Sequence, residues 1–172
     1  MVFTDDEMKT LWRHVGECEC IDMVLIQCYS GWRPGELVDL KLENINLSDG
    51  VMKGGSKTDA GIDRVIPIHP RIRQLMIKYS YLANHDRRQN LFTITKYKSY
   101  HTEFQNLMKT LGMDTTHRPH DCRKHFVSMA KRYGVDEYAI KKIVGHAISD
   151  ITEKIYTQRD PNWLRTEIEK IV

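Results

Sequence analysis

The sequence has 172 residues, of which 41% are apolar and 28% are charged, and its net charge is +3. This length fits one domain with its own core, and the composition excludes a disordered chain. No apolar run reaches the roughly 20 residues that a membrane-spanning helix needs, and residues 1–9 are too acidic and polar for a signal peptide. We therefore expect a cytoplasmic protein with no membrane partner.

The cysteines favour neither disulfide bonds nor zinc. There are four of them, at Cys18, Cys20, Cys28 and Cys122. They are too few and too irregularly spaced for a disulfide framework, and no second close pair completes a zinc site. We expect structural or incidental thiols.

Positive charge is unevenly distributed along the chain. Lys, Arg and His crowd three segments, 64–73, 85–98 and 117–142. Such clustering suits a polyanionic partner, although a solvated surface is the commoner explanation for any one cluster.

The first part of the chain has helical patterns. Thr4 and Glu7 form an S/T-x-x-E capping box, which predicts a helix over 4–15. Residues 21–29 are almost wholly apolar and end at a Ser-Gly stop, which indicates a buried second helix. Pro34 can occupy the first turn of a short third helix.

From Ile45 the pattern becomes β-like. The runs I-N-L, V-M-K and R-V-I-P-I are separated by a Ser-Asp-Gly turn and by a glycine-rich loop that contains Lys57. These runs predict three short antiparallel strands.

Helical periodicity returns at Pro70 and ends near Asn84, and Ser99 is a candidate N-cap for a helix that Gly112 stops. Further helices are expected at 120–133, at 136–145, at about 149–157 and from Pro161 onward. The predicted fold is mainly α with a small three-stranded antiparallel β-sheet, an α+β protein.

The stretch 119–157 gathers groups that suit a phosphate. It contains P-H-D-C-R-K-H-F, V-G-H and I-Y-T. His120 and Arg123 lie a turn apart on one helix face, near a helix start where an anion is favoured. Arg33 precedes a predicted helix start in the same way. Each group alone is better explained as ordinary helix-end chemistry, but the combination favours a reaction at a phosphodiester.

Opening a phosphodiester without a metal requires a nucleophile, fixed positive charge, a hydrogen-bonding base and an acid for the leaving oxygen. We assign Tyr156 as the nucleophile, Arg33 and Arg123 as the positive charge, His120 and His146 as the bases, and Lys57 as the acid.

A metal-based alternative uses the same region. His117, His120, Cys122 and His125 could form a zinc cluster or serve a metal-dependent nuclease. However, positions 120 and 122 point to different helix faces, and only Asp121 supplies a nearby carboxylate. We therefore expect no metal.

Five motifs follow one another along the chain: G-W-R-P-G-E-L, S-K-T before R-V-I-P-I, H-D-C-R-K-H-F, V-G-H and I-Y-T. In order and spacing they resemble the motifs of the tyrosine recombinase (phage integrase) family. The resemblance covers essentially the whole chain as a catalytic domain. It implies strand cleavage through a 3′-phosphotyrosine followed by rejoining, with no cofactor and no metal. It also implies the same six catalytic residues, with Glu36 as the partner that supports Arg33.

Members of this family normally carry an N-terminal core-binding domain, for which this chain has no room. We therefore expect a single catalytic domain over 1–172, which would be a fragment or a truncated member of the family. Residues 161–172 are expected to form a tail helix that docks on a neighbouring subunit. The implied partners are double-stranded DNA and other recombinase subunits, in a tetramer when active. The implied function is integration or excision of a mobile element or phage.

Two alternatives to that function remain. Resolution of chromosome or plasmid dimers would use the same chemistry. A non-catalytic DNA-binding regulator could keep the fold, but it would need no nucleophile at Tyr156.

Overall fold

The computed structural model describes residues 1–55, 64–146 and 161–172. Lys57, Tyr156 and the predicted helix at 149–157 lie outside these residues. Among the described helices, none is long and apolar enough to cross a membrane.

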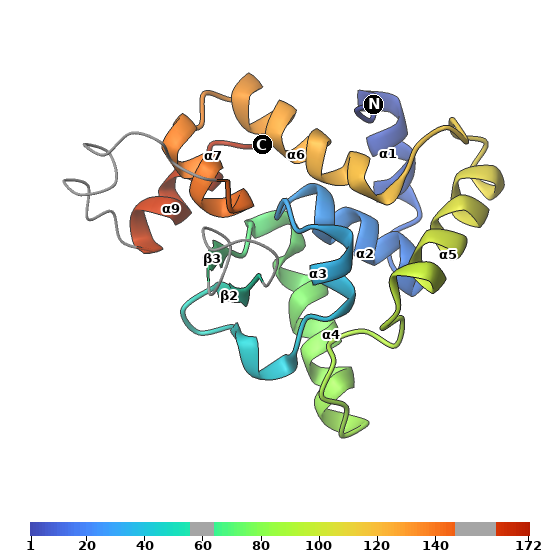
Figure 1. The fold of residues 1–172 in the computed structure, drawn as a ribbon, viewed down its shortest axis with the longest axis horizontal. Helices are drawn as coiled ribbons and strands as arrows, with labels where there is room; N and C mark the ends of the chain where they lie inside the picture. Colours follow the sequence, from blue (N-terminus) through green and yellow to red (C-terminus); the bar gives the residue numbers. More distant parts are fainter. Residues whose placement is uncertain (56–63, 147–160) are drawn as a thin grey trace.

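The described part of the chain is mostly helical (Figure 1). Its α-helices are α1 (Asp5–Arg13), α2 (Glu19–Cys28), α3 (Pro34–Val38), α4 (Arg73–His85), α5 (Tyr97–Thr110), α6 (Pro119–Arg132), α7 (Glu137–Val144) and α9 (Pro161–Ile168). Its strands are β1 (Ile45–Asn46), β2 (Val51–Gly54) and β3 (Arg64–Pro67), and single 3-10 turns lie at Leu42–Asn44 and Pro70–Ile72.

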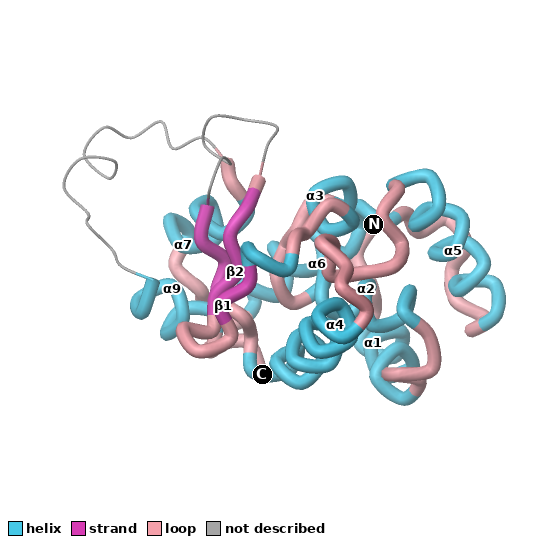
Figure 2. Tube along the Cα trace, turned by 90° about the horizontal axis from the view of Figure 1, so that it is seen from below, coloured by secondary structure: helices cyan, strands magenta, loops and turns pink. Residues whose placement is uncertain are grey.

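The three strands form one antiparallel sheet in the order β1-β2-β3, with Met52 opposite Ile66 in its centre. Both of these side chains are fully buried. Figure 2 shows the sheet between α7 and α9 on one side and the larger group of helices on the other. The predicted α+β fold with a small three-stranded antiparallel sheet is confirmed.

The capping box at the first helix is also confirmed. The Thr4 hydroxyl accepts from the Glu7 amide at 3.2 Å, and the Glu7 carboxylate accepts from the Thr4 amide at 2.8 Å. The helix is shorter than the predicted 4–15, because it ends at Arg13. End residues of helices are the least well specified part of a periodic pattern.

The predicted N-cap at Ser99 is wrong. The helix begins at Tyr97, with Lys96 as its N-cap, so Ser99 lies inside the first turn. The reason is the burial of Tyr100, whose hydroxyl donates to Gln27 Oε1 at 2.9 Å in the core. Burying an aromatic side chain outweighs the roughly 1 kcal/mol that a serine N-cap contributes.

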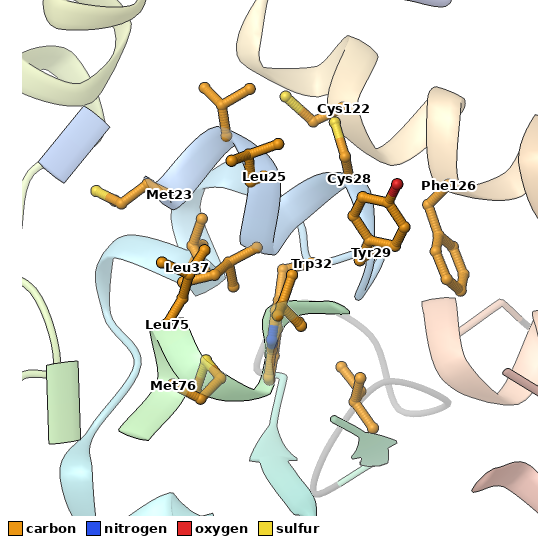
Figure 3. Close-up of a cluster of buried hydrophobic side chains, with 14 of the residues drawn as sticks. Met23, Leu25, Cys28, Tyr29, Trp32, Leu37, Leu75, Met76, Cys122 and Phe126 are labelled. Atoms are coloured by element: carbon orange, nitrogen blue, oxygen red, sulfur yellow. The ribbon is translucent and has the colours of Figure 1, made fainter. Parts of the chain in front are cut away.

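The helix α2 is the centre of the core. Every residue from Cys20 to Cys28 is buried, as expected for a helix that is almost wholly apolar. In Figure 3 its Met23, Leu25 and Cys28 face side chains from several other elements. These partners include Trp32, Leu37, Leu75, Met76, Cys122 and Phe126.

The C-terminal segment, α9 and the residues after it, packs on its own chain. Leu164, Ile168 and Ile171 are buried, and α9 lies against β3 and α7. The carbonyl of Ile171 also lies 2.8 Å from Nε2 of His69, just after the sheet.

Gly31 ends the turn after α2 and provides a test of the packing. Its φ is +68°, and a β-carbon there would lie 2.6 Å from the Phe126 ring. Gly112 has a similar φ of +64° but open space around it. We predict that Gly31→Ala lowers the free energy of unfolding by about 1–3 kcal/mol more than Gly112→Ala, because only the former overpacks the core. Urea denaturation measures both, and equal losses would contradict the packing account.

Candidate active site

The N-terminus of α3 fixes the position of Arg33. The sequence R-P-G-E makes Arg33 the N-cap and Pro34 the first helical residue, and it places Glu36 one turn along. The Glu36 carboxylate accepts from the Arg33 amide at 3.2 Å and from its Nη1 at 3.0 Å. Glu36 is buried and Arg33 is partly exposed, so the carboxylate supports the guanidinium from the protein side.

The N-terminus of α6 repeats this arrangement with R-P-H-D. The Asp121 carboxylate accepts from the Arg118 amide at 2.9 Å, which fixes the first turn. That turn carries His120 and leads to Arg123. His120 is exposed, whereas Arg123 is buried with only 4% of its surface accessible.

The C-terminus of α7 is where these groups meet. Gly145 ends the helix in the left-handed conformation (φ 66°, ψ 49°), and His146 follows it directly. Three consecutive carbonyls at this end each accept from a different arginine: Ile143 from Nε of Arg64 at 2.9 Å, Val144 from Nη2 of Arg123, and Gly145 from Nη2 of Arg33 at 3.2 Å. The helix end, which carries partial negative charge, therefore gathers arginines from β3, α6 and the start of α3.

Arg64 is the member of this cluster to which the sequence analysis gave no role. Its Nη2 donates to Glu36 Oε2 at 2.6 Å, and its guanidinium carbon lies 4.7 Å from the centre of the Trp32 ring. The available signal was a charged residue at the head of the otherwise apolar strand R-V-I-P-I. Because this first residue is buried together with the strand, its charge needs a partner inside the protein.

The arginine cluster, meaning Arg33, Arg64 and Arg123, has an excess of positive charge. Glu36 is the carboxylate that bridges two of its members. Burial, together with the charges of Arg33 and Arg64, lowers the pKa of Arg123 to about 10. Arg123 therefore stays protonated at neutral pH, and the cluster can receive an anion.

The two histidines beside the cluster have lowered pKa values, which favours their neutral form. Partial burial lowers the pKa of His120, and the charge of Arg123 lowers it further. The same two causes, in the same order, lower the pKa of His146. A neutral imidazole can accept a hydrogen bond or a proton, as the proposed bases require.

The residues considered for zinc have other partners in the structure. His117 contacts Glu7 at 3.2 Å, and Cys122 lies against Cys28 in the core (Figure 3). His125 packs edge-on against Phe3. In the part of the chain that the structure describes, no three His, Cys, Asp or Glu side chains gather closely enough to hold a metal ion.

The sequence-predicted residues that the structure describes thus lie together. Arg33 and Arg123 donate to the end of α7, and His146 directly follows it. His120 lies near enough to Arg123 and Arg33 for their charges to lower its pKa, and Glu36 contacts Arg33. Lys57 and Tyr156 fall outside the described residues, so their placement in this site remains a prediction.

Comparisons with known proteins identify the family of this chain. The model of the phage integrase family matches residues 2–162, and the chain belongs to that family. The tyrosine recombinase XerA of Pyrococcus horikoshii is 29% identical over 177 residues, which cover 97% of this chain and 60% of the relative. The XerD recombinase of Staphylococcus aureus is 26% identical and is matched over 79% of this chain and 48% of its own length.

Solved structures show the same fold. A crystal structure of XerA recombinase has a TM-score of 0.72 and 24% identity, and the match covers 96% of this chain and 63% of that one. The Tn1549 transposon integrase, solved with circular intermediate DNA, has a TM-score of 0.71 and 18% identity, over 98% of this chain and 64% of that one. The chain spans about 60% of the length of the two Pyrococcus XerA relatives.

The environment of Glu36 predicts a pH-dependent contribution to stability. Burial would raise its pKa, but the hydrogen bonds and charges of Arg64 and then Arg33 outweigh burial and lower it below the usual 4.5. Because the pKa is lowered, the ionised Glu36 carboxylate contributes fully to the free energy of unfolding above about pH 4.5. This contribution is lost as the pH falls through the folded-state pKa. We predict that Glu36→Gln lowers the free energy of unfolding by about 2 kcal/mol at pH 7, since it weakens charge-assisted hydrogen bonds.

This difference should shrink as the pH falls below 4.5, and urea denaturation between pH 3 and 7 measures it. Glu43→Gln, at an exposed carboxylate, is the control. A loss for Glu36→Gln that does not change with pH would contradict the charged role of Glu36.

Proposed function

We propose that this chain is the catalytic domain of a site-specific DNA recombinase, which cleaves and rejoins DNA strands through a 3′-phosphotyrosine intermediate. The observation that carries the proposal is the arginine cluster at the end of α7, with its excess positive charge and its two neutral histidines. Membership of the phage integrase family and the similarity to tyrosine recombinases support it.

In the proposed reaction Arg33 and Arg123 bind the non-bridging oxygens of one phosphodiester. These guanidiniums are held before DNA arrives, so little reorganisation is needed when charge develops in the transition state. A fork of two N–H groups also matches the geometry of a phosphate better than an ammonium group does.

Tyr156 would then attack the phosphorus. A bond forms between its phenolic oxygen and phosphorus while the bond from phosphorus to the 5′-oxygen breaks. His146 and His120 accept hydrogen bonds or the phenolic proton, and Lys57 donates a proton to the leaving 5′-oxygen. The phosphotyrosine ester keeps the energy of the broken bond, so a 5′-hydroxyl can rejoin the strand without ATP.

We further propose that the reaction serves integration or excision of a mobile element or phage, with double-stranded DNA as substrate. The family description and the fold shared with a transposon integrase support this setting. Resolution of replicon dimers would use the same chemistry at different DNA sites.

We also propose that other recombinase subunits are partners on DNA, as a tetramer. Segment 161–172 would mediate this contact. Because α9 packs on its own chain in the structure, docking on a neighbour would require it to leave β3 and α7.

The proposal predicts a covalent adduct between protein and DNA that depends on Tyr156. The test incubates the chain with nicked suicide duplexes whose recognition arms are randomised, in the presence of a chelator, and then isolates DNA that remains on denatured protein. We expect an adduct with the wild-type chain and none with Tyr156→Phe, since only the phenolic oxygen can form the ester. Tyr81→Phe, at an exposed tyrosine on α4, is the matched control and should leave the adduct unchanged. Adduct formation by Tyr156→Phe, or activity that the chelator abolishes, would overturn the proposal.

A further inference from the structure

Arg64 holds together three parts of the candidate site. Its Nη1 and Nη2 contact the Glu36 carboxylate, at 3.3 and 2.6 Å. Its Nε donates to the Ile143 carbonyl at 2.9 Å, and its Nη1 also lies 3.5 Å from the Gly54 carbonyl. One guanidinium therefore connects α3, the end of α7 and the end of β2.

These contacts lie inside the protein. Arg64 is buried with 7% of its surface accessible, and its guanidinium stacks over the Trp32 ring at 4.7 Å. All three nitrogens of its guanidinium already donate to a carboxylate or a carbonyl of the protein. We therefore expect Arg64 to influence the reaction through the groups that it holds.

We propose that Arg64 is a positioning residue for DNA cleavage, an inference that rests on the function proposed above. Arg64 fixes the Glu36 carboxylate and, through it, the guanidinium of Arg33. It also joins the strand end before the segment with Lys57 to the helix end before His146.

The geometry requires an arginine at this position. The fork of nitrogens meets both carboxylate oxygens of Glu36 while Nε reaches the Ile143 carbonyl. A lysine ammonium is a point charge without the planar face that stacks on Trp32, so it can hold only part of this set.

Arg64 also controls the charge of Glu36. Three cations face this carboxylate, namely Arg64 from β3, Arg33 from its own helix start and Arg123 from α6. Burial raises the pKa of Glu36, and the hydrogen bond of Arg64 is the largest of the effects that lower it. Without the guanidinium of Arg64, burial is less opposed and the pKa of Glu36 rises.

The test compares single-turnover cleavage by the wild-type chain, Arg64→Lys and Arg64→Gln. We expect cleavage to fall at least about tenfold in both variants, because a misplacement of roughly 1 Å in a reacting group costs on the order of 100-fold. DNA affinity should stay within about threefold, since the guanidinium nitrogens of Arg64 already donate to groups of the protein and are not assigned to a phosphate. Arg73→Gln removes an exposed arginine that contacts only the Leu47 carbonyl among the described residues, and it is the matched control.

A pH profile separates positioning from a general loss of folding. In Arg64→Gln, protonated Glu36 no longer holds Arg33, so the acid limb of the cleavage rate should move to higher pH. The double variant Arg64→Gln with Glu36→Gln should lose this shift, because it lacks the titrating group. An NMR titration of the Glu36 carboxyl in the DNA-free chain should show the same rise in pKa, and this readout does not depend on cleavage.

The outcomes separate this inference from the proposed function. If the wild-type chain forms no adduct, the proposed function fails, and the NMR titration still tests the hold of Arg64 on Glu36. If the wild-type chain cleaves and Arg64→Lys cleaves equally well, the positioning role is overturned. It is also overturned if the pKa of Glu36 is the same with and without Arg64. Should Arg64→Gln fail to fold, Arg64→Lys provides the cleavage comparison and its own Glu36 titration.

Discussion

The end of α7 receives three guanidiniums on three consecutive carbonyls, and the candidate site depends on this interaction. Carbonyls at a helix C-terminus have no partner within the helix and carry partial negative charge, about half an elementary charge in total. Arg64, Arg123 and Arg33 satisfy them from three separate elements. The helix end therefore acts as an assembly point that brings like charges together, and Glu36 reduces their repulsion from the other side.

Two short helix starts complete this assembly by similar means. In R-P-G-E at α3 and R-P-H-D at α6, a proline begins the helix and an acid one turn later accepts from the N-cap amide. The first turns are thereby fixed, so that Arg33 and the pair His120 and Arg123 leave their helices in defined directions. Rigid elements hold catalytic groups more accurately than loops do.

The energetics suggest why such a buried charged cluster persists. A buried ion pair contributes little net stability, because desolvation offsets the attraction between its members. Removing one member, however, leaves an uncompensated buried charge and is destabilising. The cluster thus adds little to the stability of the fold, but rearranging it costs free energy. This suits a site whose geometry must be in place before its anion binds.

Local patterns in the sequence predicted much of the fold. The Thr4 capping box, the stop at Gly112 and the three strands around their turns are each encoded within a few residues. The Ser99 cap was wrong because Tyr100, in the first turn of the helix, is buried and its hydroxyl donates to a distant partner, Gln27. Capping preference is a local effect, whereas burial depends on the whole fold.

The candidate site was predictable in its residue types but not in its connections. Residue chemistry and spacing indicated Arg33, His120, Arg123 and His146, and the resemblance to tyrosine recombinases implied the same residues. The structure brings them together. The role of Arg64 was missed because its contacts to Ile143 and Glu36 span 79 and 28 residues of sequence. A periodic pattern in the sequence does not predict contacts between residues so far apart along the chain.

The most direct test of the account is a crystal structure of the chain with a nicked DNA duplex and vanadate, which mimics the phosphoryl group in its transition state. The account predicts vanadate at the end of α7, contacted by Arg33 and Arg123 and bonded to the oxygen of Tyr156. Vanadate bound elsewhere, with Tyr156 not bonded to it, would contradict the account.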